Sequence, residues 1–282
     1  MNPEEKELWR QKFLEVLKGF RLLDDNFMTA AFQGSLECID LVLQIVLRKP
    51  EVKATKAVTQ DTLKNLHGRS VRLDIHAFAD DKEINVEIQR GGKGAGEQRA
   101  RYHGSIMDAN VLLPGEDYEN LPESYVIFIT ETDVLGDGLP IYTIERIIKE
   151  NGKSFHDGSH IIYVNSSITD ENTSLGRLMH DFRCTKADDM YYPVLAERVR
   201  YLKENEEGVA TMCEAMEKLT KEARAYGVAQ GIEQGIEQGI EQGKVDIVLG
   251  MLRDKLPLET ISRISKFSLE RVQELGKMNQ LL

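Results

Sequence analysis

The chain has 282 residues, an ordinary apolar content of 41% and a formal net charge of −11. This length allows one catalytic-sized domain plus an appendage, and the composition excludes a disordered or fibrous class. The acidic balance excludes a protein that coats nucleic acid through bulk attraction, because phosphate contacts need clustered lysine and arginine. Any contact with nucleic acid must therefore be local.

Targeting and redox features predict a cytoplasmic protein without a membrane partner. The sequence has no uninterrupted apolar run of the roughly 18 residues that a membrane span needs, and it does not open with a basic and then apolar segment. Its three cysteines lack C-x-x-C spacing, which fits reduced thiols and excludes a cysteine-based zinc site.

The first two thirds of the chain predict an α/β fold. Helical periodicity alternates with strand patterns, and the apolar runs at 125–129 and 160–164 are of the kind that is buried on both faces. The expected helices are 4–23, 27–47 and 97–111, and the expected strands are 52–58, 71–78, 84–89, 125–129 and 160–164. A hairpin followed by a parallel-type crossover predicts a mixed sheet flanked by helices.

The remainder of the chain predicts helices. Residues 230–243 contain three copies of Gly-Ile-Glu-Gln, and each glycine costs about 1 kcal/mol relative to alanine in a helix, so we interpret this segment as a marginal helix or spacer. Three short helices are expected after residue 244, with Pro257 at a helix start and Ser268 as the last N-cap. Their spacing resembles a helix-turn-helix unit, although any three-helix interaction tail gives the same pattern. The expected parts are a core domain at 1–205, a spacer at 206–243 and a helical tail at 244–282.

The hairpin at 71–89 has a testable register. If Asp80 and Asp81 form a two-residue turn, the numbers of facing residues sum to 161. One surface is then apolar, with the pairs Leu73 and Ile88, Ile75 and Val86, and Ala77 and Ile84. The other surface is polar, with the pairs Arg72 and Gln89, Asp74 and Glu87, and His76 and Asn85. A slip of one residue would oppose apolar and polar side chains, so the register is this one or differs from it by two.

Asp74 and Glu87 become cross-strand neighbours in that register. Two carboxylates about 5 Å apart repel each other unless a cation or a proton lies between them. Magnesium is the expected cation, because it prefers oxygen ligands and is commonly held by carboxylates plus a substrate phosphate. Gln89 lies on the same strand face, where its amide could orient water or a phosphate oxygen. The alternative is that these side chains line a solvated face of an amphipathic hairpin.

Residues 71–75 and 85–89 resemble the D…E-x-Q form of the PD-(D/E)XK nuclease signature. Further segments are similar to the bacterial PD-(D/E)XK nuclease family transposases, also called recombination-promoting nucleases; they are 22–28, 68–70, 99–102, 114–118 and 128–131. The resemblance covers roughly residues 20–205. It implies a restriction-endonuclease-like fold and magnesium-dependent cleavage of phosphodiester bonds in DNA, with manganese as a substitute cation.

The resemblance also implies roles for individual residues. Asp74 and Glu87 match the metal-binding acids, and Glu87 would help to activate water. Gln89 stands where the broader signature has lysine, so a positive charge is missing and weaker activity is expected. In related nucleases an acid on the leading helix completes the site; Glu37 is the first candidate and Asp25 the second, and either also fits a solvated helix residue.

A basic cluster follows the hairpin in the sequence. Lys93, Arg99 and Arg101 are close enough to it that contact with DNA phosphates is expected, the alternative being an ordinary helix surface. His76 would lie beside Asp74, either supporting it or simply exposed on the strand.

Two functions from different classes follow. The first is a metal-dependent DNA endonuclease linked to recombination or mobile elements. The second is a weak or inactive nuclease fold that serves as a DNA-binding or protein-interaction module. Cutting both strands of a duplex would need a homodimer.

Overall fold

The computed structural model describes residues 3–65, 68–91 and 94–282. The chain forms two compact units, Met1–Met216 and Glu217–Leu282. A helix, α7 (Glu206–Arg253), passes from the first unit into the second. The residues expected to form a spacer are therefore helical.

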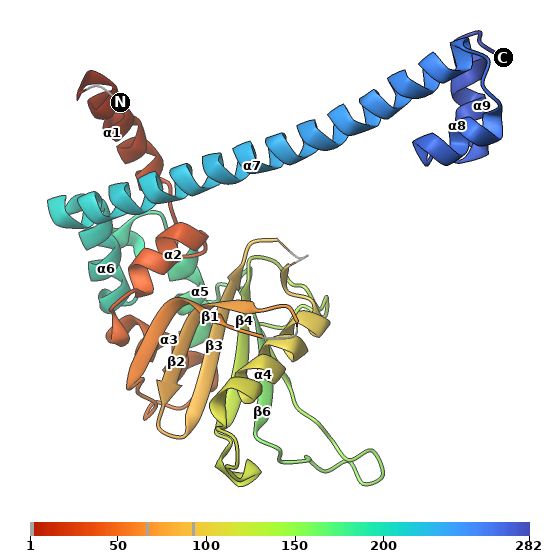
Figure 1. Ribbon diagram of the computed structural model, residues 1–282. Coiled ribbons are helices and arrows are strands. Elements are labelled where there is room, and N and C mark those ends of the chain that lie inside the picture. Colours follow the sequence, from red (N-terminus) through yellow and green to blue (C-terminus); the bar gives the residue numbers. More distant parts are fainter. Residues whose placement is uncertain (1–2, 66–67, 92–93) are drawn as a thin grey trace. The chain divides into compact units, whose positions relative to one another are not determined.

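A six-stranded mixed sheet forms the centre of the first unit (Figure 1). The strands are β1 (Lys56–Leu63), β2 (Val71–Ala79), β3 (Lys82–Gln89), β4 (Glu123–Thr130), β5 (Ile141–Ile144) and β6 (Ser159–Asn165), in the spatial order β1-β2-β3-β4-β6-β5. The pairs β1–β2, β2–β3 and β5–β6 are antiparallel, and β3–β4 and β4–β6 are parallel. The predicted mixed sheet, its hairpin and its parallel crossover are confirmed.

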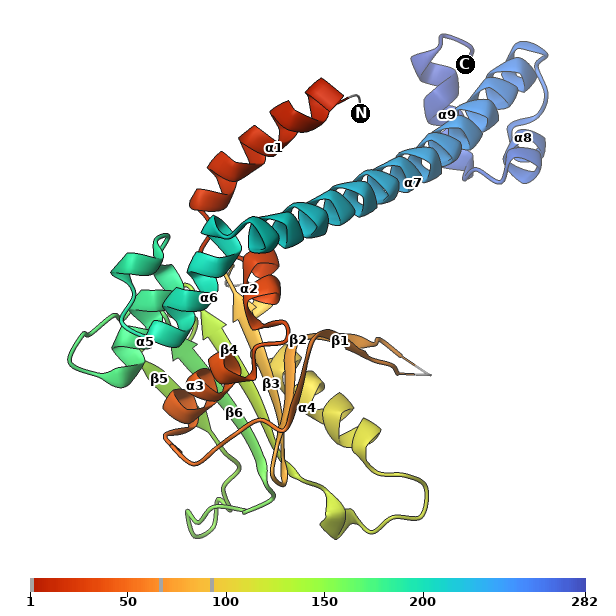
Figure 2. The same ribbon diagram turned by 90° about the vertical axis from the view of Figure 1, so that its left-hand side faces the viewer.

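Helices cover both faces of the sheet (Figures 1 and 2). The helices of this unit are α1 (Pro3–Lys18), α2 (Asp25–Phe32), α3 (Leu36–Leu47), α4 (Glu97–Val111), α5 (Ser174–Arg183), α6 (Pro193–Glu204) and the start of α7, with short 3-10 turns at Tyr118–Asn120 and Ala187–Asp189. α4 packs on one face, where Phe128 and Tyr163 belong to its core cluster. The opposite face packs against the other helices, with Ile127 in the larger core. Alternate residues of β4 thus enter different cores, as expected for a strand buried on both faces.

Three predicted elements differ from the structure, and one strand was not predicted. The helix expected at 4–23 ends at Lys18. The single helix expected at 27–47 is two helices, α2 and α3, bent by 109°. The break contains Gly34 at a φ of 71°, a conformation that glycine adopts without steric cost. β1 extends to Leu63, beyond the strand expected at 52–58, and β5 lacks a pattern strong enough to be predicted.

The predicted hairpin register is confirmed from Ile75↔Val86 to Ala79↔Lys82, whereas the pairs predicted for residues 72–74 are not part of the ladder. The predicted apolar surface is wrong for Leu73, which packs in the core beneath α4, whereas Ile75 packs in the core on the other face. β1 is irregular beside Asp74. Gln60 of β1 has a φ of 54° and lies between the pairs Thr59↔Ile75 and Asp61↔Leu73. The alternation of side chains therefore changes at Asp74.

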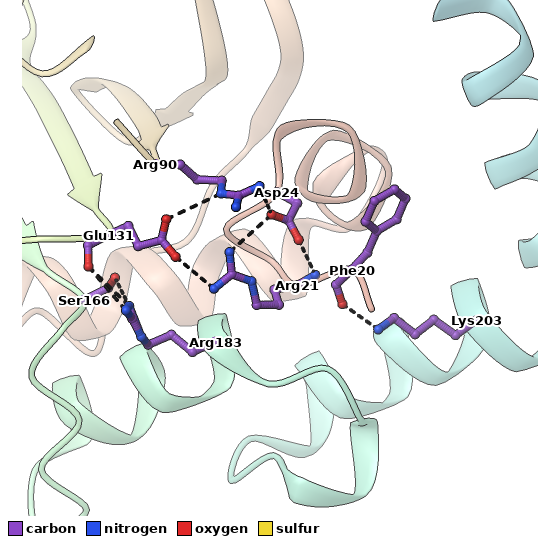
Figure 3. A network of polar contacts seen from close by, with 8 residues as sticks. All are labelled: Phe20, Arg21, Asp24, Arg90, Glu131, Ser166, Arg183 and Lys203. Carbon is purple, nitrogen blue, oxygen red and sulfur yellow. Dashed lines mark hydrogen bonds and ion pairs between the residues drawn. The ribbon is translucent and has the colours of Figure 1, made fainter. Parts of the chain in front are cut away.

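A polar network holds the segment between α1 and α2 against the ends of β3 and β4 (Figure 3). Arg21 Nη1 lies 2.8 Å from Glu131 Oε1, and Arg90 Nη1 lies 2.8 Å from Asp24 Oδ1. Arg183 of α5 donates to the backbone oxygen of Glu131 at 3.2 Å. These contacts fix the start of α2 beside the carboxyl end of β3.

The second unit has a small core of its own, formed by the end of α7 with α8 (Leu258–Ser265) and α9 (Leu269–Met278). Pro257 precedes α8, and the Ser268 side chain accepts a hydrogen bond from the backbone N–H of Arg271, as predicted for an N-cap. Among the described residues, no single helix is long and apolar enough to cross a bilayer; α2 and α3 meet those criteria only as a bent pair.

Candidate active site

A cleft of about 1100 Å³ opens between the start of α2, the strands β2 and β3, and the first half of α4. It is lined by Leu23, Asp25, Arg69, Ser70, Val71, Arg72, Asp74, Ile88, Gln89, Arg90, Gln98, Arg99, Arg101, Tyr102, His103 and Ser105. Four residues predicted for the site, namely Asp74, Gln89, Arg99 and Arg101, meet there. Glu87 lies against Asp74 and Arg99 with no exposed surface.

The Asp74 carboxylate bridges the strands on both sides of it. Oδ2 accepts a hydrogen bond from the backbone N–H of Ile88 at 3.0 Å, and Oδ1 lies 3.4 Å from Nε2 of Gln60 in β1. Burial raises the pKa of Asp74 above its usual value, while the Ile88 N–H works in the opposite direction and the charge of Asp25 adds to the rise. Asp74 is therefore a fixed and partly desolvated carboxylate.

Glu87 is the most deeply buried acid of the site. Its Oε1 accepts from the backbone N–H of Asp74 at 3.3 Å, and its Oε2 lies 2.8 Å from Nη2 of Arg99. Burial and then the Asp74 charge raise the pKa of Glu87 to about 7, while Arg99 opposes the rise. Two adjacent carboxylates with raised pKa values are the electrostatic pattern expected of a cation site.

Arg99 is oriented by a chain of side chains on α4 and β3. Its Nε donates to Nε2 of His103 at 3.2 Å, and Nδ1 of His103 lies 3.1 Å from the Asn85 amide. Burial and then the charge of Arg99 lower the pKa of His103 to about 4, so the ring is neutral and accepts at Nε2. Its proton is then on Nδ1, which also lies 3.6 Å from Glu87 Oε1.

Gln89 packs against the glycine-rich connector. A Cβ placed on Gly94 would meet the amide of Gln89 and would approach Nη1 of Arg99 to 3.5 Å. Nη1 of Arg99 also donates to the backbone oxygen of Gly94 at 2.9 Å. The amide of Gln89 thus lies beside the guanidinium, in the position where the signature would place a lysine.

Of the two acids expected from the leading helices, Asp25 lines the cleft and Glu37 does not. Asp25 begins α2 and lines the cleft, and its Oδ1 lies 3.4 Å from the same Gln60 Nε2 that contacts Asp74. Glu37 is exposed in the first turn of α3 and does not line the cleft. The break at Gly34 separates the two residues, because it turns α3 away from the axis of α2.

The walls of the cleft are basic although the chain is acidic. Arg99 and Arg101 are joined there by three arginines that the sequence patterns do not single out, Arg69, Arg72 and Arg90. Lys93, the third residue of the predicted basic cluster, lies outside the described residues. Five guanidinium groups around two carboxylates form the local positive surface that contact with phosphate requires.

His76 does not contact Asp74. It is buried between two other carboxylates, with Nδ1 2.7 Å from Asp61 Oδ2 and Nε2 2.7 Å from Glu83 Oε1. His180, Asp181 and Cys184 form a separate cluster that does not line the cleft. Their possible metal-ligand atoms lie within 4.8 Å of one another.

Gln60, Asn85 and His103 are parts of the site that the sequence analysis does not identify. Asn85 precedes Glu87 by two positions on the same strand, and His103 follows Arg99 by four on a helix, so both spacings were available signals. Nothing in the sequence marks Gln60, which reaches the site through its positive φ in β1.

The donor set fits a divalent cation of the magnesium type. Asp74 and Glu87 supply carboxylate oxygens on adjacent strands, with Asp25 nearby as a third acid. A positive group, the Arg99 guanidinium, already lies at hydrogen-bond distance from Glu87 Oε2. These residues form a cation-binding arrangement, and Asp74 and Glu87 are its candidate ligands.

Comparison with known families gives one match. A sequence model of the family described as PD-(D/E)XK nuclease family transposase matches residues 38–186, slightly more than half of the chain. The matched segment includes the whole hairpin and α4, and therefore all of the site except the residues from α2. Neither the curated proteins nor the solved structures contain a significant match.

Proposed function

Because the chain belongs to the PD-(D/E)XK nuclease family transposases, we propose that it is a magnesium-dependent endonuclease that hydrolyses phosphodiester bonds in DNA. The observation that carries the proposal is an arginine-lined cleft in which the Asp74 carboxylate lies against the buried carboxylate of Glu87. Hydrolysis is proposed rather than strand transfer, since one carboxylate-held cation and water suffice for it. A DNA substrate also agrees with the cytoplasmic location expected from the sequence.

Asp74 and Glu87 would hold the cation, with Mn²⁺ as a substitute for Mg²⁺. When bound, such an ion polarises the phosphoryl group and makes water more acidic. Burial and the Asp74 charge raise the pKa of the Glu87 carboxyl to about 7, so a cation held there would compete with a proton near neutral pH. Asp25 is the third acid that we assign to this side of the cleft.

The remaining residues would bind and orient the substrate. Arg99 and Arg101 project from one helix into the cleft, where guanidinium groups pair with phosphate oxygens in a two-pronged geometry. The Gln89 amide beside Arg99 would donate a hydrogen bond to a phosphate oxygen. Arg99 thereby supplies the positive charge that a lysine at position 89 would otherwise contribute.

The test is cleavage of supercoiled plasmid by the full chain with Mg²⁺ or Mn²⁺. We expect nicking or linearisation that is abolished by chelator and by Asp74→Ala or Glu87→Ala, and that survives in Glu150→Ala, an exposed acid outside the cleft. Asp25→Ala should reduce cleavage, and Glu37→Ala should not. Linear product formed without a nicked precursor would support a homodimer that cuts both strands.

The second candidate function is a DNA-binding or protein-interaction module without cleavage. The absence of lysine at position 89 favours it. Plasmid binding without cleavage in any divalent cation, with the Asp74→Ala variant binding equally well, would replace the endonuclease proposal with this one.

A further inference from the structure

We propose that Arg99 takes the place of the divalent cation at Glu87 in the resting protein and transfers to a substrate phosphate when that cation enters. DNA and the metal ion would therefore each strengthen the binding of the other. This inference rests on the proposed function, because it assumes that Asp74 and Glu87 hold a metal ion.

Arg99 is well placed to substitute for a metal ion. It lies 2.8 Å from a carboxylate oxygen of Glu87, and the Glu87 side chain has no exposed surface, so the guanidinium is its main source of charge compensation. The Arg99 side chain itself is 40% exposed and lines the cleft. One face of the same group therefore meets the buried acid while the rest is open to a ligand.

The Arg99 guanidinium and the metal ion compete for the same oxygen, Oε2 of Glu87. Glu87 Oε1 and Asp74 Oδ2 accept hydrogen bonds from the backbone. The other two oxygens have side-chain partners, Gln60 at Asp74 Oδ1 and Arg99 at Glu87 Oε2, and only the partner at Glu87 Oε2 is a cation. A divalent ion at Oε2 would repel a guanidinium at hydrogen-bond distance from that oxygen, and repulsion between charges a few ångströms apart is strong in a partly desolvated site. Arg99 must then move away from Glu87 Oε2 or bind it less strongly.

The cleft offers Arg99 a second partner only when substrate is present. Its other contacts are neutral, namely the Gly94 backbone oxygen and the His103 ring. The carboxylates that line the cleft are Asp25 and Asp74, which we place beside the same cation, so neither is a free acid for the released guanidinium. A phosphate group is the ligand that a released guanidinium binds best. By linkage, a substrate that binds Arg99 favours metal binding by the same factor as the metal favours substrate.

Metal binding without DNA gives the first measurement. Mn²⁺ is titrated into the full chain at pH 8.5, and free Mn²⁺ is followed by electron paramagnetic resonance. We expect Arg99→Gln to bind Mn²⁺ about fivefold more tightly than the wild type, and Arg99→Lys to show a smaller gain. Arg101→Gln is the matched control: it removes the same charge from the same helix and cleft, two residues away, and should leave Mn²⁺ affinity within about twofold.

DNA binding gives the second measurement. Anisotropy of a labelled duplex is measured with and without Ca²⁺, a hard cation that binds oxygen ligands and is used here in place of Mg²⁺ so that the duplex stays intact. In the wild type Ca²⁺ should raise DNA affinity by about fivefold or more, and in Arg99→Gln by a clearly smaller factor. Arg101→Gln should weaken DNA binding equally with and without Ca²⁺. The factor by which Ca²⁺ raises DNA affinity should therefore be the same as in the wild type.

The outcomes separate this inference from the proposed function. If Asp74→Asn abolishes Mn²⁺ binding but neither Arg99 variant binds Mn²⁺ more tightly, the metal site stands and the role of Arg99 is wrong. If Asp74→Asn and Glu87→Gln leave Mn²⁺ binding unchanged, the proposed metal site itself is wrong, and the inference is rejected with it. Tighter Mn²⁺ binding in Arg99→Gln together with reduced coupling to DNA supports the inference.

Discussion

The carboxylate of Asp74 accepts a hydrogen bond from the backbone N–H of Ile88 at 3.0 Å, just beyond the last regular pair of the β2–β3 ladder. The same side chain is thus a candidate metal ligand and a structural acceptor between strands. It also lies against Glu87, whose pKa its charge raises. Substitutions at position 74 can separate these roles.

Asp74→Asn and Asp74→Ala should both reduce plasmid cleavage by roughly two orders of magnitude or more, because each removes a metal-binding charge. Their stabilities should differ. Asparagine keeps an acceptor for Ile88 and removes the repulsion with Glu87, so the variant should unfold at the same or higher urea concentration than the wild type. Alanine leaves the Ile88 N–H without its partner, at a cost of about 1 kcal/mol relative to asparagine. Equal stability of the two variants would contradict the structural role.

The raised pKa of Glu87, about 7, predicts how the metal-free protein responds to pH. A carboxylate whose pKa is higher in the folded than in the unfolded state binds more protons when folded, so stability falls as pH rises from about 4.5 to 7. Urea unfolding in EDTA at a series of pH values measures this slope. Glu87→Gln should flatten it. Added Mn²⁺ should raise the melting temperature more at pH 8 than at pH 6, because the ion competes with the proton.

Gly94 should be required for the position of the Gln89 amide. An alanine Cβ there would clash with the end of the Gln89 side chain, a flexible group that can move aside at little cost in stability. Gly94→Ala should therefore lower cleavage to the level of Gln89→Ala without changing the melting temperature. Gly91→Ala is the matched control, since its added Cβ would meet no atom within 4 Å and should leave cleavage intact. Equal loss in both glycine variants would instead indicate a general effect on the connector.

Much of this fold follows from local pattern. The hairpin was predictable because a slip of one residue would oppose apolar and polar residues of β2 and β3, and α4 because the glycine connector precedes it and Pro114-Gly115 follows it. The break between α2 and α3 was not predictable. An apolar run from 27 to 47 is typical of one helix, and Gly34 is the only glycine within it.

Part of the candidate site was also predictable from local sequence pattern. Asp74, Glu87 and Gln89 lie on two strands joined by a short turn, so the hairpin itself brings them near one another. The partners of these residues come from elements whose placement depends on long-range packing. Gln60 approaches through an irregular residue of β1, and Asp25 through the network that anchors the start of α2. Such contacts leave no periodic signal in the sequence.

His76 predicts a separate effect of pH on stability. The buried ring lies between Asp61 and Glu83, and burial lowers its pKa while both carboxylates raise it, with a net rise above the usual value of 6.5. A histidine with a raised folded-state pKa contributes stability that is fully present below pH 6.5 and is lost as pH rises through the folded-state value. Glu83→Gln removes the more buried of the two carboxylate charges, so it should shift this loss to lower pH.

Urea unfolding of the wild type and Glu83→Gln between pH 6 and pH 9 tests this, because groups common to both proteins cancel in the difference. The stability difference in favour of the wild type should be largest at pH 6 and should shrink towards pH 9, as the ring loses its proton in both proteins. Asp80→Asn, an exposed acid in the turn of the same hairpin, should give a pH-independent difference. A Glu83→Gln difference that stays constant across the range would contradict the prediction, because it would mean that His76 does not change its charge between pH 6 and pH 9.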